Sequence, residues 1–512
     1  MVKTVVGEHN FPNQQPLLCY RFLPKHPLLC YKFHSKHPLL CNKKSSKHPL
    51  LCNKLFIFTR YNMNFKRTIF SHLLTWKQDK LRKPLIMRGA RQVGKTTIIR
   101  EFAKQYDNYI LLNLEKVNDI KFFDENEDVN TIRDQLFLSH QIQSKDSVLL
   151  FIDEIQESPK AIQFLRYFYE EIPELHVIAA GSLLEFALKE VKSFPVGRVQ
   201  FMYLHPCNFE EYLQAIGHEQ ASTALNQIPV KTFAHDILIN LFHEYAIIGG
   251  MPEAIKNYAP NKDITRLPAI YESIWETYKN DVEKYASNGS SRKIIKHIMN
   301  TASLYLDERI KFQNFGNSNY RSREISEAFQ NLDDAKIIQL IYPTTDTEVP
   351  VKPDLKKSPR MQFLDTGIVN HALGLQAELL SLPDLSNAFK GAIIPHLITQ
   401  ELISLNWNNR QKPNFWVREK RQSQAEVDLV YSYKKIVVPI EIKSGKVGTL
   451  KSLHQFIERT NHAFAIRICG GEFLIEKHLT PGEKKPYTLM SLPYYLGTQL
   501  PKYVEWFVEG QN

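Results

Sequence analysis

The main part of this 512-residue chain has little cysteine and no long hydrophobic run. Four of the six cysteines lie within the first 62 residues, which leaves only Cys207 and Cys469 for the other 450. Two scattered cysteines provide no disulfide framework, which favours a reducing cytoplasm. No stretch of about 18 uncharged apolar residues occurs, so the sequence predicts no membrane-spanning helix. The length and an apolar fraction of 43% predict a globular protein of several domains, because single cores stop growing near about 250–300 residues.

Acidic residues are nearly absent from residues 1–62, where ten Lys or Arg face a single acid, Glu8. This leader therefore carries nine of the eleven net positive charges, and the remaining 450 residues are nearly neutral. A nearly neutral body gives no electrostatic reason to expect strong nonspecific binding to nucleic acid.

The basic leader contains an eleven-residue repeat, PLLCYRFLPKH, PLLCYKFHSKH, PLLCNKKSSKH and PLLCNK, over residues 16–54. A proline in every unit excludes a continuous helix, and the units lack turn and core signals. We expect residues 1–62 to be a disordered leader, translated from a start placed upstream of Met63. Zinc binding is the alternative, because His26 and Cys30, and the matching pairs of later units, offer imidazole and thiolate. The leader has no signal-peptide pattern.

An apolar strand, a glycine-rich loop and an amphipathic helix follow one another in residues 83–106, KPLIMRGARQVGKTTIIREFAKQY. The loop fits GxxxxGK[ST], the pattern of a phosphate-binding loop in its strand–loop–helix setting. Its glycines allow backbone N–H groups to meet phosphate oxygens, and the helix N-terminus adds a positive dipole. We expect Lys95 to neutralise the β- and γ-phosphates of ATP and Thr96 to ligate Mg²⁺. The predicted nucleotide-binding residues are Gly89, Ala90, Arg91, Gln92, Val93, Gly94, Lys95, Thr96 and Thr97.

A second apolar run, SVLLFIDE at residues 147–154, ends in two acids. Five consecutive apolar residues are typical of a central parallel strand that is covered on both faces. We expect Asp153 to hold Mg²⁺ through water and Glu154 to orient and deprotonate the attacking water. A third predicted strand, at 176–180, leads to Ser182. This residue is either a polar sensor of the γ-phosphate or only the N-cap of the next helix.

These motifs resemble the AAA-type ATPases of the P-loop class. More narrowly, GARQVGKTT, LLFIDEIQ, AAGSLLEFAL and FPVGRVQFMYLHPCNFEEYL are similar to a prokaryotic family that joins this ATPase to a C-terminal domain of unknown function. The resemblance implies Mg²⁺-dependent ATP hydrolysis. It also makes Arg198 a candidate arginine sensor or finger, in cis or in trans, and a finger in trans implies a homo-oligomer. The alternative is that Arg198 is only a surface side chain after a turn.

The middle of the chain, residues 226–345, begins with a helix-rich stretch that reads as a lid or linker. Between 290 and 345, three helical stretches are followed by an apolar strand, a pattern compatible with a winged helix. Arg321 and Arg323 are candidates for phosphate contacts. Neighbouring acids weaken that signal, and winged helices also serve as connectors between proteins. DNA is therefore a candidate partner.

In the C-terminal part, Asp428 lies on one predicted strand, and Glu441 and Lys443 lie two apart on the next, so they share a face. Two carboxylates and an ammonium at one sheet end suit Mg²⁺-dependent attack on a phosphodiester, with Asp428 and Glu441 as metal ligands. The set resembles the PD-(D/E)xK restriction-endonuclease-like fold, whose auxiliary helix positions match Glu401 and Gln455. The module is then either a nuclease or an inactive scaffold.

The sequence thus predicts an α/β protein with three parts after the leader: an AAA-type ATPase domain at 63–225, a helical and winged-helix-like region at 226–345 and a restriction-endonuclease-like domain at 346–512. The expected function is ATP binding and Mg²⁺-dependent hydrolysis coupled to a nuclease-like, DNA-acting module. The alternative is a signalling ATPase whose C-terminal module is an inactive binding scaffold. No membrane partner is expected.

Overall fold

The computed structural model describes four short leader strands and then residues 66–143, 146–182, 184, 195–284, 286, 289–376, 391–408, 411–418, 425–443 and 450–510. Its contacts divide the chain into two units, Met1–Met63 and Asn64–Asn512. Within these described ranges, no helix combines the length and the apolar character needed to span a bilayer. Cys207 and Cys469 are both buried and free.

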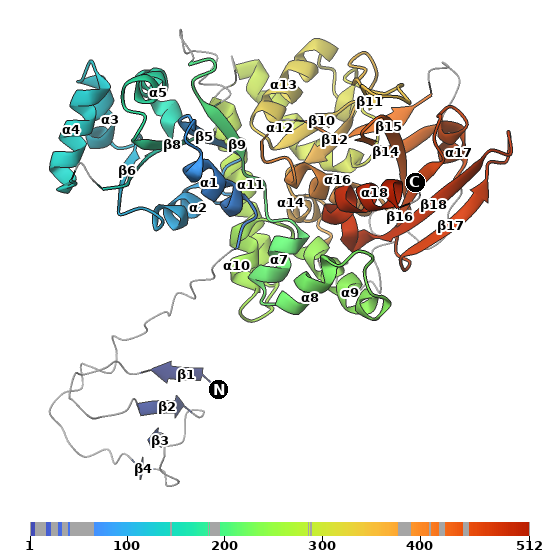
Figure 1. Cartoon of the computed structure of the whole chain (residues 1–512), viewed down its shortest axis with the longest axis horizontal. Coiled ribbons are helices and arrows are strands. Elements are labelled where there is room, and N and C mark those ends of the chain that lie inside the picture. The colour runs from blue at the N-terminus through green and yellow to red at the C-terminus, as the bar shows by residue number, and fades with distance from the viewer. Residues whose placement is uncertain are drawn as a thin grey trace. The chain divides into compact units, whose positions relative to one another are not determined.

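Four short strands form an antiparallel sheet in the leader, and their bounds are β1 Val2–Val5, β2 Leu17–Arg21, β3 Leu29–Lys32 and β4 Leu39–Leu40 (Figure 1). The repeat sets part of the register, since Cys19 of one unit lies opposite Cys30 of the next. These four segments are strands where disorder was expected. The rest of the leader, for which we also expected disorder, lies outside the described residues.

A five-stranded parallel sheet has the order β6-β7-β8-β5-β9 (Figure 1). Its strands are β5 Leu85–Arg88, β6 Asn108–Asn113, β7 Val148–Asp153, β8 His176–Ala180 and β9 Gln200–Tyr203. The helices of this part are α1 Ile69–Gln78, α2 Lys95–Ala103, α3 Val117–Asp124, α4 Val129–His140 and α5 Pro159–Glu171. Because β8 lies between β5 and β7, the residues that follow these three strands meet at one edge of the sheet.

Burial explains the composition of this sheet. Every residue of β7 is buried, as its apolar run predicts. Val148, Leu150 and Ile152 pack in one core with the apolar faces of α3, α4 and α5. Successive strand residues point to opposite faces, and α2 contacts β7 outside that core. A strand covered on both faces carries its acid, Asp153, only at its C-terminal end.

Helices dominate the middle of the chain, and one antiparallel ribbon accompanies them (Figure 1). The helices are α7 Phe209–Ala215, α8 Glu219–Leu225, α9 His235–Ile248, α10 Pro252–Tyr258, α11 Leu267–Lys284, α12 Gly289–Thr301, α13 Ser322–Asp334, α14 Thr366–Ala372 and α16 Ile393–Ser404. The ribbon pairs β10 Ile338–Ile341 with β12 Arg360–Phe363. It therefore spans the boundary that we expected at 345/346.

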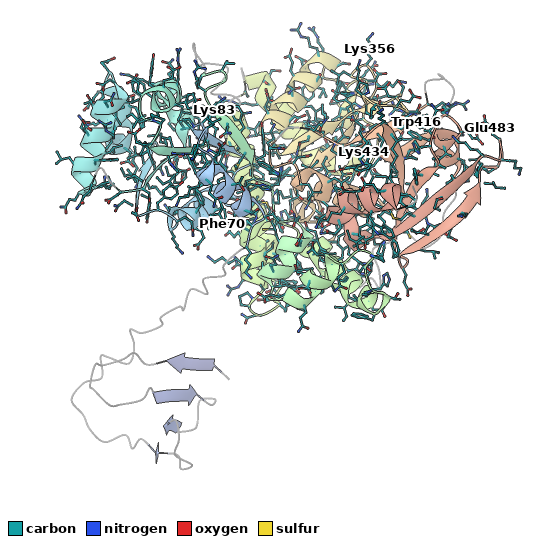
Figure 2. All side chains as sticks on the ribbon, viewed as in Figure 1. Phe70, Lys83, Lys356, Trp416, Lys434 and Glu483 are labelled. Carbon is teal, nitrogen blue, oxygen red and sulfur yellow. The ribbon has the colours of Figure 1, made fainter. Side chains whose placement is uncertain are left out.

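A seven-stranded mixed sheet forms the C-terminal part, in the order β11-β13-β14-β15-β16-β18-β17 (Figure 1). Its strands are β11 Pro343–Thr344, β13 Asn414–Val417, β14 Glu426–Tyr433, β15 Ile436–Ile442, β16 Phe464–Cys469, β17 Leu474–Leu479 and β18 Pro486–Pro493. The flanking helices are α17 Lys451–Ile457 and α18 Leu500–Glu509. Trp416, marked in Figure 2, packs edge-on against Phe456 of α17, with ring centroids 5.2 Å apart. The mixed α/β class predicted from the sequence is confirmed.

Candidate functional site

Two positions of the glycine-rich loop between β5 and α2 have a backbone conformation that favours glycine. Gly94, which caps α2, has φ 97°. Gly89 has φ 150°, and a Cβ atom there would lie 2.3 Å from the carbonyl oxygen of Leu204. These two conformations strain any residue with a Cβ atom. They give the loop the tight turn that the sequence pattern requires.

Lys95 is buried inside this loop. Its Nζ donates to the carbonyl oxygens of Gly89 at 3.0 Å and of Ala90 at 2.9 Å. Burial lowers the pKa of Lys95 to about 8, while the negative charges of Glu154 and Asp153 act in the opposite direction. An ammonium among loop amides at a helix N-terminus is suited to an anion such as phosphate.

Thr96 and Asp153 meet where α2 begins and β7 ends. The Thr96 hydroxyl donates to Asp153 Oδ2 at 2.8 Å. Burial raises the pKa of the Asp153 carboxyl, and this hydrogen bond partly offsets the effect. A hydroxyl and a carboxylate this close fit a hard cation such as Mg²⁺. In the described ranges no three His, Cys, Asp or Glu side chains are arranged so that they could hold a metal ion, so a cation here would depend on ligands from a bound nucleotide.

Glu154 and Ser182 lie after neighbouring strands of the same sheet. Glu154 adopts a left-handed backbone conformation, φ 52°, and its carboxylate accepts a hydrogen bond from Gln156 Nε2 at 2.7 Å. The buried Ser182 Oγ has no hydrogen-bond partner among the residues that the structure describes. A buried hydroxyl without a partner there favours the sensor interpretation. The helix that Ser182 was alternatively expected to cap lies almost wholly outside the described residues.

Arg198 makes its described contacts away from the loop. Its Nε lies 2.7 Å from Glu170 Oε1 on α5, and the Arg198 side chain is half exposed. This geometry matches the surface alternative within one chain. A role for Arg198 in a neighbouring subunit stays a prediction.

Two contacts that the sequence did not predict hold the loop from outside. Arg67, just before α1, is buried and donates to the Val93 carbonyl oxygen at 3.1 Å, while its Nε lies 2.9 Å from Glu211 Oε2. Arg91 donates from Nη1 to both oxygens of Asp281 on α11, at 2.7 and 2.9 Å. The Arg91–Asp281 pair joins residues 190 positions apart, which no local pattern indicates.

The C-terminal residues Asp428, Glu441 and Lys443 are brought together, as expected. The Ile442 amide donates to Asp428 Oδ2 at 2.8 Å, and Lys443 Nζ lies 2.6 Å from Glu441 Oε1. Glu441 is buried, and its Oε2 has no hydrogen-bond partner within the described part of the chain. Burial, and then the charge of Asp428, raise the pKa of Glu441, although Lys443 acts against this. Arg360 of β12, which the sequence analysis missed, lies against Asp428, with Nη2 3.4 Å from Oδ1.

Glu401 has a different place from the one that the nuclease pattern implied. Both of its oxygens accept the Phe209 amide at the start of α7, at 3.2 and 3.1 Å, and Tyr245 donates to Oε1 at 2.8 Å. Gln455 accepts a hydrogen bond from Arg418 at 3.1 Å. Glu401 thus binds the N-terminal part of the chain instead of completing the C-terminal carboxylates.

Residues 81–213 match a family described as an AAA domain. This part of the chain is an AAA-type ATPase domain. Residues 239–379 and 390–482 match two families, each described as a domain of unknown function (DUF8612 and DUF4143). The comparison with curated proteins gives no match.

Three solved structures show a distant similarity. The Walker-type ATPase PABY2304 of Pyrococcus abyssi is 13% identical, with TM-score 0.39, over 60% of this chain and 96% of that one. A DNA replication initiation factor is 12% identical, with TM-score 0.23, over 67% and 96%. PCH-2 of C. elegans is 17% identical, with TM-score 0.20, over 34% and 51%. Likenesses this weak carry no argument about function.

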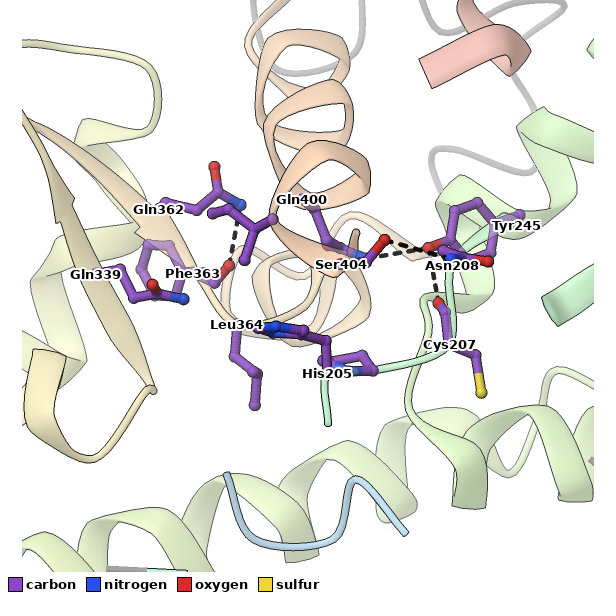
Figure 3. A pocket seen from close by; sticks show the side chains of 12 residues that line it. His205, Cys207, Asn208, Tyr245, Gln339, Gln362, Phe363, Leu364, Gln400 and Ser404 are labelled. Carbon is purple, nitrogen blue, oxygen red and sulfur yellow. Dashed lines mark hydrogen bonds between the residues drawn. The ribbon is translucent and has the colours of Figure 1, made fainter. Parts of the chain in front are cut away.

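A polar junction joins the AAA domain to α16 (Figure 3). It surrounds a cavity of about 10 Å³, close to the room that one water molecule needs. Tyr245 donates to the Cys207 carbonyl oxygen at 2.9 Å, and Gln400 of α16 donates to the Tyr245 hydroxyl at 3.1 Å. Asn208 donates to Ser404 of α16 at 3.3 Å. The segment after β9 is therefore hydrogen-bonded to the C-terminal part of the chain.

Proposed function

We propose that the protein binds ATP with Mg²⁺, hydrolyses it slowly and uses the cycle to switch the state of its C-terminal domain. The observation that carries this proposal is the Thr96–Asp153 hydrogen bond beside the buried Lys95, within the matched AAA domain. In this proposal the backbone of residues 89–97 holds the phosphates. Lys95 neutralises their charge, and Thr96 and Asp153 hold the Mg²⁺ ion, which stabilises charge on the phosphates.

Hydrolysis is assigned to Glu154 as the general base, because it follows directly after the residue that holds Mg²⁺. The hydrogen bond from Gln156 fixes the Glu154 carboxylate before the reaction. Ser182 senses the γ-phosphate. Arg198 acts as a finger on a neighbouring subunit, which makes a homo-oligomer part of the proposal.

For the remaining parts we propose an AAA domain at 63–225, a winged-helix-like middle at 226–345 and a restriction-endonuclease-like domain at 346–512. The helices α12 and α13 followed by β10 support the winged-helix assignment, and β10 pairs with β12 of the next part. An antiparallel β14–β15 pair, continued by parallel β16 and β18, supports the nuclease-like one. In this proposal DNA is the partner of the C-terminal domain, and Asp428, Glu441 and Lys443 form its metal-dependent centre.

The second candidate function is a signalling ATPase whose C-terminal domain only binds a partner. The contact of Arg360 with Asp428 favours it, because a guanidinium then meets a carboxylate that a nuclease needs for metal. Plasmid nicking with Mg²⁺ and ATP separates the two candidates. Asp428→Ala and Lys443→Ala should abolish any nicking while ATP hydrolysis continues. If the wild type nicks no DNA, the C-terminal domain is a binding scaffold and the second candidate is supported.

The ATPase assignment is tested by Lys95→Ala and Glu154→Gln. Lys95→Ala should lose ATP binding, since it removes the charge that faces the phosphates. Glu154→Gln keeps the shape of the site but loses the base, so it should bind ATP and hydrolyse it at least about 100-fold more slowly. Lys104→Ala, at an exposed lysine just after the same helix, is the matched control and should behave as wild type. A normal hydrolysis rate in Glu154→Gln would move the base elsewhere.

A further inference from the structure

One guanidinium neutralises several carboxylates at the C-terminal centre. Arg360 Nη1 lies 3.1 Å from Asp307 Oδ1, and its Nη2 lies 3.4 Å from Asp428 Oδ1 and donates to Glu426 Oε1. The Arg360 side chain is largely buried. These three carboxylates raise its pKa in spite of that burial, so the guanidinium stays charged. Glu426 and Asp428 are two apart on β14 and share a face of the sheet.

The residues of this centre do not fit a divalent cation as they stand. Both Asp428 oxygens already have partners, Arg360 on Oδ1 and the Ile442 amide on Oδ2. In the described ranges no three ligating side chains come together as a metal cluster. The buried Glu441 Oε2, in contrast, accepts no hydrogen bond from the residues that the structure describes. A buried acceptor without a donor is destabilising, and a cation beside it would remove that cost.

We propose that Arg360 is an internal counter-ion that keeps the C-terminal carboxylate centre closed to divalent cations. Its withdrawal then opens a cation site formed by Glu426, Asp428 and Glu441. The inference deepens the proposed function, on which it rests, by naming how the centre is regulated. Glu426 and Asp428 are partly buried and Glu441 is buried, so a positive charge close to them stabilises their ionised form. A guanidinium and a divalent cation therefore compete for the same negative side chains.

The strand that carries Arg360 is connected to the nucleotide loop through a single helix. At the far end of β12, the Phe363 ring lies 6.5 Å from the ring of Trp275 on α11. Farther along α11, Asp281 binds Arg91 of the phosphate-binding loop. A shift of α11 when nucleotide binds would thus reach β12 without an intervening flexible segment. This gives the ATPase cycle a physical means of moving Arg360.

The test measures Mn²⁺ binding to the full chain without nucleotide, by the electron paramagnetic resonance signal of free Mn²⁺. Arg360→Gln should bind one more Mn²⁺ per chain than wild type. The affinity of this additional site should be at least about tenfold higher than that of any Mn²⁺ site at the C-terminal centre of wild type. Adding Asp428→Asn should abolish this gain. Arg309→Gln is the matched control, since Arg309 forms an isolated β-bridge with Arg360 and its Nη1 lies 3.8 Å from Glu426 Oε2, yet its side chain is more exposed than that of Arg360.

A charge-balanced variant protects the test against misfolding. Arg360→Gln alone removes the guanidinium from three partly buried carboxylates, and this is destabilising. Combining it with Asp307→Asn removes one charge of each sign and keeps Glu426, Asp428 and Glu441. Mn²⁺ should raise the melting temperature of this double variant by several degrees and leave that of wild type unchanged.

Two results would overturn the proposal. One is that wild type binds Mn²⁺ equally well at a site that Asp428→Asn removes, and the other is that both Arg360 variants bind no more Mn²⁺ than wild type. ATP hydrolysis and plasmid nicking, measured on the same preparations, separate this failure from that of the proposed function. If the Arg360 variants gain no Mn²⁺ site but hydrolyse ATP normally, only the counter-ion role is refuted. A Mn²⁺ gain without nicking supports that role and removes only the nuclease activity.

Discussion

Lys95 donates to two carbonyl oxygens of its own loop, and neither of these acceptors carries a full negative charge. Burial therefore dominates and lowers the pKa of the ammonium to about 8. A nearby polyanion raises the pKa of a lysine, because it stabilises the charged form. Binding of ATP should consequently bring a proton to Lys95 when its amine is unprotonated in the ATP-free protein. The unprotonated amine is the main form above pH 8.

We predict that ATP affinity falls as the pH rises from 8 to 9.5, by a factor that approaches ten per pH unit. Proton uptake should be near zero at pH 7 and approach one proton per ATP at pH 9. Titration calorimetry in buffers of different ionisation enthalpy measures this uptake directly. Lys104→Ala, outside the loop, should show the same uptake as wild type. Uptake that stays at zero at pH 9 would contradict a lowered lysine pKa.

Local spacing predicted the loop residues because the chemistry of a phosphate-binding loop lies within nine consecutive positions. The same holds for Glu441 and Lys443, two apart on one strand. Arg67, Asp281 and Arg360 could not be predicted in this way. Each reaches its site from a distant element, and the position of its charge is set by tertiary packing. For such residues a single sequence offers only charge and spacing.

At the scale of elements, the loop depends on the segment that leads into α1. Arg67 donates a hydrogen bond to the Val93 carbonyl oxygen, and its charge is neutralised by Glu211 of α7. Its side chain lies 3.9 Å from the position that a Cβ atom on Gly94 would take. This segment precedes residue 81, where the match to the AAA family begins. The phosphate-binding loop is thus supported by residues outside the matched domain.

We predict that Arg67→Gln destabilises the protein by about 3–5 kcal/mol, because it leaves Glu211 buried without its counter-ion. It should also weaken ATP binding, since Val93 loses the donor that fixes the loop. Adding Glu211→Gln should restore most of the free energy of unfolding, measured by urea denaturation. The ATP affinity of this double variant should remain low. Recovery of wild-type affinity would show that Arg67 acts through stability alone.

Strands were predictable where burial is strongest. The apolar runs of β5, β7 and β8 each lead to the polar residues that the motifs need, and all three are strands. The leader strands were not predicted, because a proline-containing repeat gives no alternation of apolar and polar residues. The two-residue strand β11 is also too short to leave a pattern. It is a strand only because β13 lies beside it.

At the scale of the whole molecule, the two halves of the folded unit meet at Glu401. This carboxyl accepts hydrogen bonds from the AAA domain and from α9, yet it is buried among apolar side chains and other acids. Burial raises its pKa to about 8, the hydrogen bonds from Tyr245 and Phe209 oppose the shift, and the charges of Glu211 and Glu210 add to it. A residue expected to serve chemistry thus connects two parts of the fold.

This raised pKa fixes the sign of a pH dependence. A glutamate in the unfolded chain has a pKa of about 4.3. Between that pH and 8, the folded protein therefore keeps a proton on Glu401 that the unfolded chain has released. The stabilisation from Glu401 is therefore complete below pH 4 and is lost as the pH rises towards 8. We predict that Glu401→Gln reduces the fall of unfolding free energy between pH 5.5 and 7.5, by up to about 1.4 kcal/mol per pH unit. Urea denaturation across this range measures the difference, and Glu219→Gln, at an exposed position, should keep the wild-type slope. Equal slopes for Glu401→Gln and wild type would show that this carboxyl is ionised in the folded protein.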